Sequence, residues 1–151
     1  MPTSRRTFLS AAAAIAAYLE GAPLANLSAE QAAVLDALCE QMLPSDDLPG
    51  AREANVVRYI DRQLGTEHKR YVEDYRSGLN ALRAAGFLER SFEARTTLLE
   101  RAEAGKVASV PPAFVRMVSD HTMQGFFGDP KHGGNQDSVS WKMLGIGGHS
   151  H

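Results

Sequence analysis

Helical periodicity, interrupted by proline and glycine, constrains the fold of this chain more than any other feature. Apolar residues recur at helical spacing in five segments, and no segment alternates apolar and polar residues for long enough to predict a strand. Loops near Asp46 and Ala108 join the predicted helices. The sequence therefore predicts an all-α fold, a small bundle of about five short helices with an irregular, glycine-rich C-terminal segment.

Start and stop signals set the bounds of these five helices. Ser28 and Gln31 form a capping-box pattern at the start of the first helix, and Pro44 ends it. The apolar spacing, together with the glycines and prolines that interrupt helices, sets the bounds of the other four. These helices run from Val56 to Leu64, ending at Gly65; from Tyr71 to Leu82, with Gly86 as a left-handed cap; from Ser91 to Ala102, before Gly105; and from Pro111-Pro112 to Phe127.

Composition excludes several classes of function. The 151 residues predict one domain, and the net charge of −2 gives no basic field for nucleic acid or an anionic membrane surface. A single cysteine, Cys39, excludes an internal disulfide framework, a thiolate zinc cage and c-type haem attachment. Cys39 lies on the apolar face of the first predicted helix, so we expect a buried, unreactive thiol.

The N-terminal residues match an export signal. Ser4-Arg5-Arg6-Thr7-Phe8-Leu9 precedes an alanine-rich stretch from Ala11 to Ala17, which is the order of a basic region and a weakly apolar region in a twin-arginine signal. We predict that residues 1–25 form this signal, with Ser4, Arg5, Arg6, Phe8 and Leu9 carrying it, and that residues 26–151 form the helical domain. The alternative is a surface helix. A cut after Ala25 would match the small-residue pattern of cleavage sites poorly, because Pro23 stands at the −3 position.

The C-terminal segment departs from helical periodicity at Gly128. Asp129-Pro130 and Gly133-Gly134-Asn135 predict turns with special backbone angles. Large apolar residues follow in this glycine-rich stretch, and they must either be buried or form an exposed patch. Two arrangements stay open: the segment folds back on the bundle, or it docks into a partner. The residues concerned are Trp141, Met143, Leu144 and Ile146.

This C-terminal segment resembles the gluconate 2-dehydrogenase subunit 3 family, and the similarity covers essentially the whole chain. The helical body and the twin-arginine start fit the family, while the C-terminal motif is the specific part. His132 departs from the pattern, which has an aromatic residue before Gly-Gly-Asn. The motif consists of Gly125-Phe126-Phe127, Asp129-Pro130, Gly133-Gly134-Asn135, Asp137, Trp141-Lys142 and Gly145.

The resemblance implies a non-catalytic small, or gamma, subunit of a membrane-associated dehydrogenase that acts on CH–OH donors such as gluconate or glucose. Its partner would be a large FAD-binding subunit of the glucose–methanol–choline type, which has no signal of its own. The twin-arginine translocase would export both chains to the periplasm, and a multihaem cytochrome c subunit would complete the complex. The small subunit would then act as export carrier, assembly chaperone and structural partner, and the substrate would be selected by the partner.

The same resemblance, together with the apolar residues, predicts where the partner binds. Aromatic and aliphatic side chains would supply the anchors, because such residues dominate the energy of most interfaces. Polar and glycine residues would fix the loop or make polar contacts. The predicted interface residues are Phe126, Phe127, Asp129, Pro130, Gly133, Gly134, Asn135, Asp137, Trp141, Met143 and Leu144.

The chain shows no chemistry of its own at the level of sequence. Gly145-Ile146-Gly147-Gly148 lacks the strand and helix that a nucleotide-binding turn requires. We therefore predict no catalytic, cofactor-binding or metal-binding residue in this chain, and no relay of electrons. The alternative function is a stand-alone periplasmic enzyme or binding protein with a histidine-bound metal. Its ligands would come from His121, His132, His149 and His151.

Overall fold

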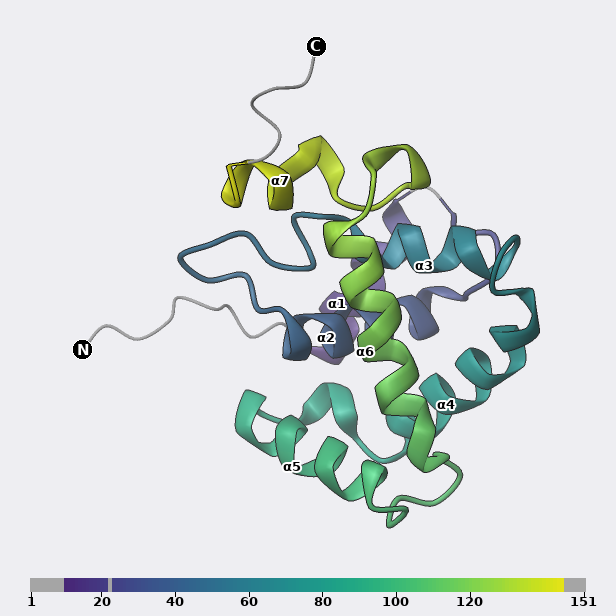
Figure 1. Cartoon of the computed structure of the whole chain (residues 1–151). Helices are drawn as coiled ribbons and strands as arrows, with labels where there is room; N and C mark the ends of the chain where they lie inside the picture. Colours follow the sequence, from purple (N-terminus) through teal and green to yellow (C-terminus); the bar gives the residue numbers. More distant parts are fainter. Residues whose placement is uncertain (1–9, 22, 146–151) are drawn as a thin grey trace.

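The computed structural model describes residues 10–21 and 23–145, and every regular element in these ranges is helical (Figure 1). The predicted all-α bundle is therefore confirmed. Within these ranges no helix has the length and apolar character needed to cross a bilayer. The α-helices are α1 (Ala11–Glu20), α2 (Ala29–Met42), α3 (Val56–Leu64), α4 (Val72–Ala84), α5 (Phe92–Glu103), α6 (Pro112–Phe127) and α7 (Val139–Met143). Short 3₁₀ turns are η1 (Lys69–Tyr71), η2 (Phe87–Glu89), η3 (Pro130–His132) and η4 (Gln136–Ser138).

The five helices predicted from the sequence correspond to α2 through α6, and local capping explains their bounds. Ser28 Oγ accepts a hydrogen bond from the Gln31 backbone N–H, and the Gln31 side chain accepts one from the Ser28 N–H, which completes the capping box. Ser91 caps α5 in the same way through the Ala94 N–H. Gly86 follows α4 with a φ of 82°, a conformation that glycine adopts without a steric penalty.

Two further helices lie outside the predicted five. The alanine-rich stretch forms α1, which begins after a Ser10 side chain that accepts from the Ala13 N–H. The segment expected to be irregular is irregular as far as Ser138 but then forms the five-residue α7. A helix of that length spans too few residues for periodicity to reveal it. Its existence depends on tertiary contacts, which are described below.

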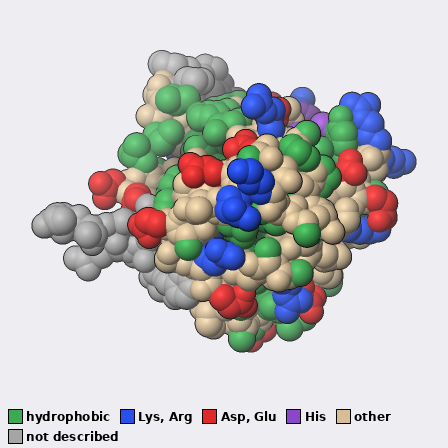
Figure 2. Space-filling view, turned by 90° about the horizontal axis from the view of Figure 1, so that it is seen from below, with side chains coloured by type: hydrophobic (Ala, Val, Ile, Leu, Met, Phe, Trp, Pro, Cys, Tyr) green, Lys and Arg blue, Asp and Glu red, His purple; other side chains and the backbone are tan. Residues whose placement is uncertain are grey.

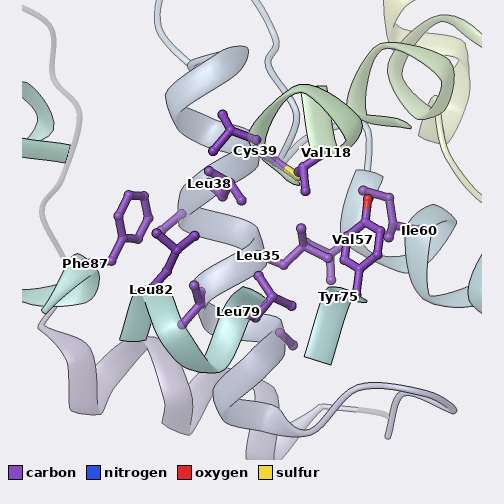
Figure 3. Packing of buried hydrophobic residues seen from close by; sticks show 14 of the residues in the cluster. Leu35, Leu38, Cys39, Val57, Ile60, Tyr75, Leu79, Leu82, Phe87 and Val118 are labelled. Carbon is purple, nitrogen blue, oxygen red and sulfur yellow. The ribbon is translucent and has the colours of Figure 1, made fainter. Parts of the chain in front are cut away.

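The core is built around α2, which packs against α1, α3, α4, α5 and α6. Figure 3 shows Leu35, Leu38 and Cys39 of α2 among side chains from α3, α4 and α6. Cys39 is buried as predicted, and its Sγ lies 3.3 Å from Thr122 Oγ1. Burial raises the pKa of this thiol to about 12, so it stays protonated and unreactive at neutral pH.

The connection between α1 and α2 is fixed by Asp61, a buried residue of α3. Its carboxylate accepts hydrogen bonds from the backbone N–H groups of Ala25 (2.8 Å), Asn26 (2.8 Å) and Leu27 (3.1 Å). The Asn26 side chain donates to the Asp61 carbonyl at 2.8 Å, and Arg76 Nε donates to the Asn26 carbonyl at 3.1 Å. Residues 25–27 are thus held from two sides, by α3 and by α4.

The loop between α2 and α3 depends on a second buried carboxylate, Glu40. It accepts from the Ser45 N–H, the Ser45 hydroxyl and the Arg52 N–H at distances of 2.8 to 3.0 Å. The Glu53 carboxylate accepts from the Gly50 N–H at 2.8 Å. The loop is therefore held to the bundle while the Leu48 side chain stays 62% exposed.

Helix α1 packs on α2 without burying any of its residues fully. Tyr18 makes the most defined contact: it hydrogen-bonds Asp36 of α2, which also pairs with Arg52. Burial, together with the nearby Asp36 charge, raises the pKa of Tyr18 well above its usual range. In contrast, Leu19 at the end of α1 is 69% exposed. The helix lies on the domain surface rather than within its core.

Candidate functional site

Asn135 joins the C-terminal segment to the end of α6. Its side chain is fully buried, and its Nδ2 donates to the Gly128 carbonyl at 2.8 Å. Its Oδ1 accepts from the Ser140 N–H at 2.9 Å and from the Ser140 hydroxyl at 2.8 Å. The Asn135 side-chain amide thus pairs with polar groups at two places, the carbonyl just after α6 and the Ser140 groups in the first turn of α7. Asn135 has a φ of 44°, and asparagine tolerates this left-handed conformation better than most residues.

The two glycines before Asn135 permit a close backbone approach. Gly133 has a φ of 101°, which side chains rarely allow. A Cβ at Gly134 would lie 2.3 Å from the Gly125 carbonyl oxygen of α6, and a Cβ at Gly125 would lie 2.7 Å from the Tyr59 ring of α3. The Gly-Gly-Asn motif and Gly125 are therefore required for packing the segment onto α3 and α6.

Further hydrogen bonds hold the segment to the start of α3. The Gln136 N–H donates to the Ala54 carbonyl at 3.1 Å, and Asn55 Nδ2 donates to Gln136 Oε1 at 3.0 Å. Arg62 donates to the Lys131 carbonyl at 3.1 Å. Asp129 caps η3 by accepting from the Lys131 N–H at 3.0 Å. The predicted turn residues thus shape the loop through their own backbone contacts.

The apolar residues of α7 fold back on the bundle, which is one of the two arrangements that the sequence left open. Trp141 is half-buried, and its Nε1–H donates to the Phe127 carbonyl at 2.9 Å. Met143 packs partly buried against the core. Figure 1 shows α7 lying across the end of α6 at which the chain leaves that helix. The segment is therefore a folded part of this chain.

Folding back leaves an exposed apolar surface, which we define by Met123, Phe127 and Leu144. Their exposed fractions are 37%, 40% and 55%. Met123 and Phe127 are four residues apart on α6 and so share one face. Leu144 lies three residues after Trp141, whose hydrogen bond to the Phe127 carbonyl holds α7 at the end of α6. We call this set the C-terminal apolar surface.

The predicted interface residues divide into buried and exposed groups. Phe126 is 1% exposed and contacts Phe127 edge-on, so in this fold it is a core residue and not a surface anchor. Gly134 and Asn135 are also buried. Exposed or partly exposed are Phe127, Asp129, Pro130, Gly133, Asp137, Trp141, Met143 and Leu144. Binding of a partner by this second group stays a prediction.

The predicted signal residues Ser4, Arg5, Arg6, Phe8 and Leu9 lie outside the described residues, as do Ile146, His149 and His151. His132 is exposed in η3. The described residues contain no group of three or more side chains that could together hold a metal ion.

A histidine cleft, which the sequence analysis missed, lies between η1, α4 and α6. Tyr75 OH is hydrogen-bonded to His121 Nδ1 at 2.8 Å, and His68 stacks on His121 with ring centroids 4.1 Å apart. The cleft has a volume of about 570 Å³ and is also lined by Tyr71 and Phe114. No local signal pairs His68 with His121, because they come together only through tertiary packing.

The charges around this cleft are balanced. Two guanidinium groups and two carboxylates line it, those of Arg70, Arg116, Asp74 and Asp120. Burial, and secondarily the neighbouring His68, lowers the pKa of His121 from 6.5 to about 4. Elsewhere, Figure 2 shows basic and acidic side chains interspersed over one face of the molecule. Neither region gives the single-sign field that would attract a polyanion.

The comparisons with known proteins give one match. A family model described as Gluconate 2-dehydrogenase subunit 3 matches residues 29–148, which include α2 through α7. No curated protein and no solved structure matches the chain. The matched range begins at the helix that centres the core and includes the whole Asn135 region.

Replacing Asn135 tests the connection between α6 and α7. Asn135→Ala removes three hydrogen bonds and leaves buried backbone groups unpaired, so we expect a loss of about 2–3 kcal/mol in the free energy of unfolding. Urea unfolding measures it. Gln136→Ala removes a side chain in an exposed contact and should lower stability by less than about 0.5 kcal/mol. Equal losses in the two variants would contradict the role given to Asn135.

The depressed pKa of His121 predicts acid sensitivity. Because the folded chain resists protonation, its stability is complete above pH 6.5 and falls as the pH drops toward 4, by up to about 1.4 kcal/mol per pH unit. His121→Gln should flatten this dependence, whatever its effect on stability at neutral pH. His132→Gln, at an exposed site, serves as the control. Urea midpoints between pH 7 and 4 give the slopes, and an unchanged slope in His121→Gln would refute the assignment.

Proposed function

The chain belongs to the gluconate 2-dehydrogenase subunit 3 family, and on that premise we propose that it is the non-catalytic small subunit of a periplasmic, FAD-dependent dehydrogenase of the glucose–methanol–choline type. Family membership makes it a subunit of a dehydrogenase complex. The proposal adds the role within that complex: the chain binds the large flavin subunit, assists its assembly and carries it through the export machinery.

The observation that most supports this proposal is the C-terminal apolar surface. Phe127 and Leu144 are exposed although the segment around them is fixed by Asn135 and by the Trp141 hydrogen bond. A preformed apolar surface loses little conformational entropy when a partner covers it, so less of the free energy of burial is lost to ordering the surface. Exposed aromatic and aliphatic groups on an ordered frame are what the core of an interface requires.

Export would depend on Arg5 and Arg6. In the proposed order of events the large subunit folds with FAD, binds the small subunit, and is exported with it by the twin-arginine translocase. The flavin and the haem c would reside in the partner subunits, and these subunits would hold the complex at the membrane. The small subunit would contribute binding surface and the signal, while substrate recognition and electron transfer belong to its partners.

Substituting an exposed anchor tests the interface without disturbing the core. Leu144→Asp should abolish co-purification of the flavin subunit, because the interface would then bury an unpaired carboxylate. Leu48→Asp is the matched control: Leu48 is 62% exposed, against 55% for Leu144, but lies on the loop between α2 and α3. Affinity purification with flavin absorbance of the eluate gives the readout. A complex that survives Leu144→Asp, or that Leu48→Asp disrupts equally, would contradict the proposed interface.

Changing the arginine pair tests the carrier role separately. Arg5→Lys combined with Arg6→Lys keeps the charge but removes the twin-arginine pattern. Both this chain and the flavin subunit should then remain in the cytoplasm, with dehydrogenase activity lost from the periplasmic fraction. Normal activity in that fraction would show that another chain carries the signal.

A further inference from the structure

We propose that the chain is cut between Ala25 and Asn26 and that Asp61 then binds the new N-terminal ammonium group of Asn26. This inference rests on the proposed export function, because removal of a signal is the event that would produce the cut. It assigns a processing site and an ion pair to residues that otherwise only connect α1 to α2.

The carboxylate of Asp61 is already placed on the nitrogen in question. Asp61 is 5% exposed, and its Oδ1 accepts from the Asn26 N–H at 2.8 Å. Two other backbone N–H groups, those of Ala25 and Leu27, complete its hydrogen bonds. Within the described part of the chain no lysine or arginine forms an ion pair with it. Arg52 pairs instead with Asp36, and Arg76 with Glu73.

A buried carboxylate in this setting lacks a compensating charge. Hydrogen bonds from neutral amides satisfy its lone pairs, but ionised groups in protein interiors are usually paired with an opposite charge. Hydrolysis of the Ala25–Asn26 peptide bond would supply that charge at the position that the Asn26 nitrogen already occupies. The uncut chain therefore already contains the carboxylate of the ion pair, and the cut creates the ammonium group that completes it.

The chemistry is an ordinary hydrolysis by a peptidase that removes export signals. One water is consumed: the carbonyl carbon of Ala25 gains the oxygen and becomes a carboxylate, and the Asn26 nitrogen becomes an ammonium group. The Ala25 N–H leaves with the upstream fragment, so Asp61 loses that hydrogen bond. The ammonium group has additional N–H donors to replace it.

The contacts around the cut allow the part of the chain before Asn26 to leave, and they keep Asn26 in place. Ala25 is exposed and α1 contains no fully buried residue, whereas Leu27 is 6% exposed and begins the core. Asn26 stays held by its side-chain bond to the Asp61 carbonyl and by Arg76, which donates to its carbonyl. The sequence left the cleavage site open because Pro23 fits the pattern poorly. The hydrogen bonds to Asp61 narrow the cut to the bonds before residues 25, 26 and 27, and among these only the bond before Asn26 follows a small residue, Ala25.

The first test is the N-terminus of the exported chain. Intact mass and N-terminal sequencing of the protein from the periplasm should give a chain that begins at Asn26. A chain that begins at another residue, or that keeps α1, would overturn the proposal. A chain that is never exported would contradict the proposed function instead, and the pairing would then be decided by a cut made in the test tube.

For that cut, residues 22–25 are replaced by Ile-Glu-Gly-Arg, so that factor Xa releases a chain beginning with Asn26. An aldehyde reagent selective for N-terminal amines then reports how available the amine is. Pairing with Asp61 should slow labelling at neutral pH about tenfold relative to the same chain unfolded in urea, which corresponds to about one unit in the pKa of the amine. Equal labelling rates of the folded and the unfolded chain would overturn the pairing.

A pair of substitutions separates the effect of the Asp61 charge on labelling from the effect of burying the amine. Asp61→Asn should restore rapid labelling in the folded, cut chain, while Asp129→Asn, at an exposed carboxylate, should leave the slow rate unchanged. Arg76, which donates to the Asn26 carbonyl, and its partner Glu73 are identical in all samples. If labelling is slow in both Asp61 and Asp61→Asn chains, burial alone protects the amine and the ion pair is refuted.

Discussion

The Asn135 side chain is the contact on which the functional half of the structure depends. Its amide bridges the Gly128 carbonyl at the end of α6 and the Ser140 N–H and hydroxyl at the start of α7. Without this bridge a five-residue helix would have little reason to form, and Trp141 would have no fixed position. The exposed positions of Phe127 and Leu144 follow from the geometry that the bridge imposes.

Buried polar side chains hold other irregular segments in a similar way. Asp61 holds the residues before α2, and Glu40 holds the loop before α3, each through three hydrogen bonds to one buried carboxylate. The helical core around α2 is thus built from apolar residues of this chain, while its irregular segments are ordered by single polar side chains. This separation explains how a small chain can be folded and still present an unsatisfied apolar surface.

The parts of the fold that could be predicted are those specified by neighbours in the sequence. The capping box of Ser28 and Gln31, the Ser91 cap and the helical spacing of α2 through α6 are all local. Helix α7 and the stacking of His68 on His121 depend on residues far apart in the chain, so periodicity could not reveal them. The motif with Gly134 and Asn135 identified the family, but only the structure shows its glycines packed against α3 and α6.

The most direct test of the account is photo-crosslinking from the C-terminal apolar surface. A benzophenone amino acid placed at position 144 should, on irradiation of the assembled complex, crosslink the chain to the flavin subunit, and the adduct can be mapped by mass spectrometry. The same group placed at position 48 should give no such adduct. Crosslinking from position 48 together with none from position 144 would contradict the claim that the segment held by Asn135 forms the interface.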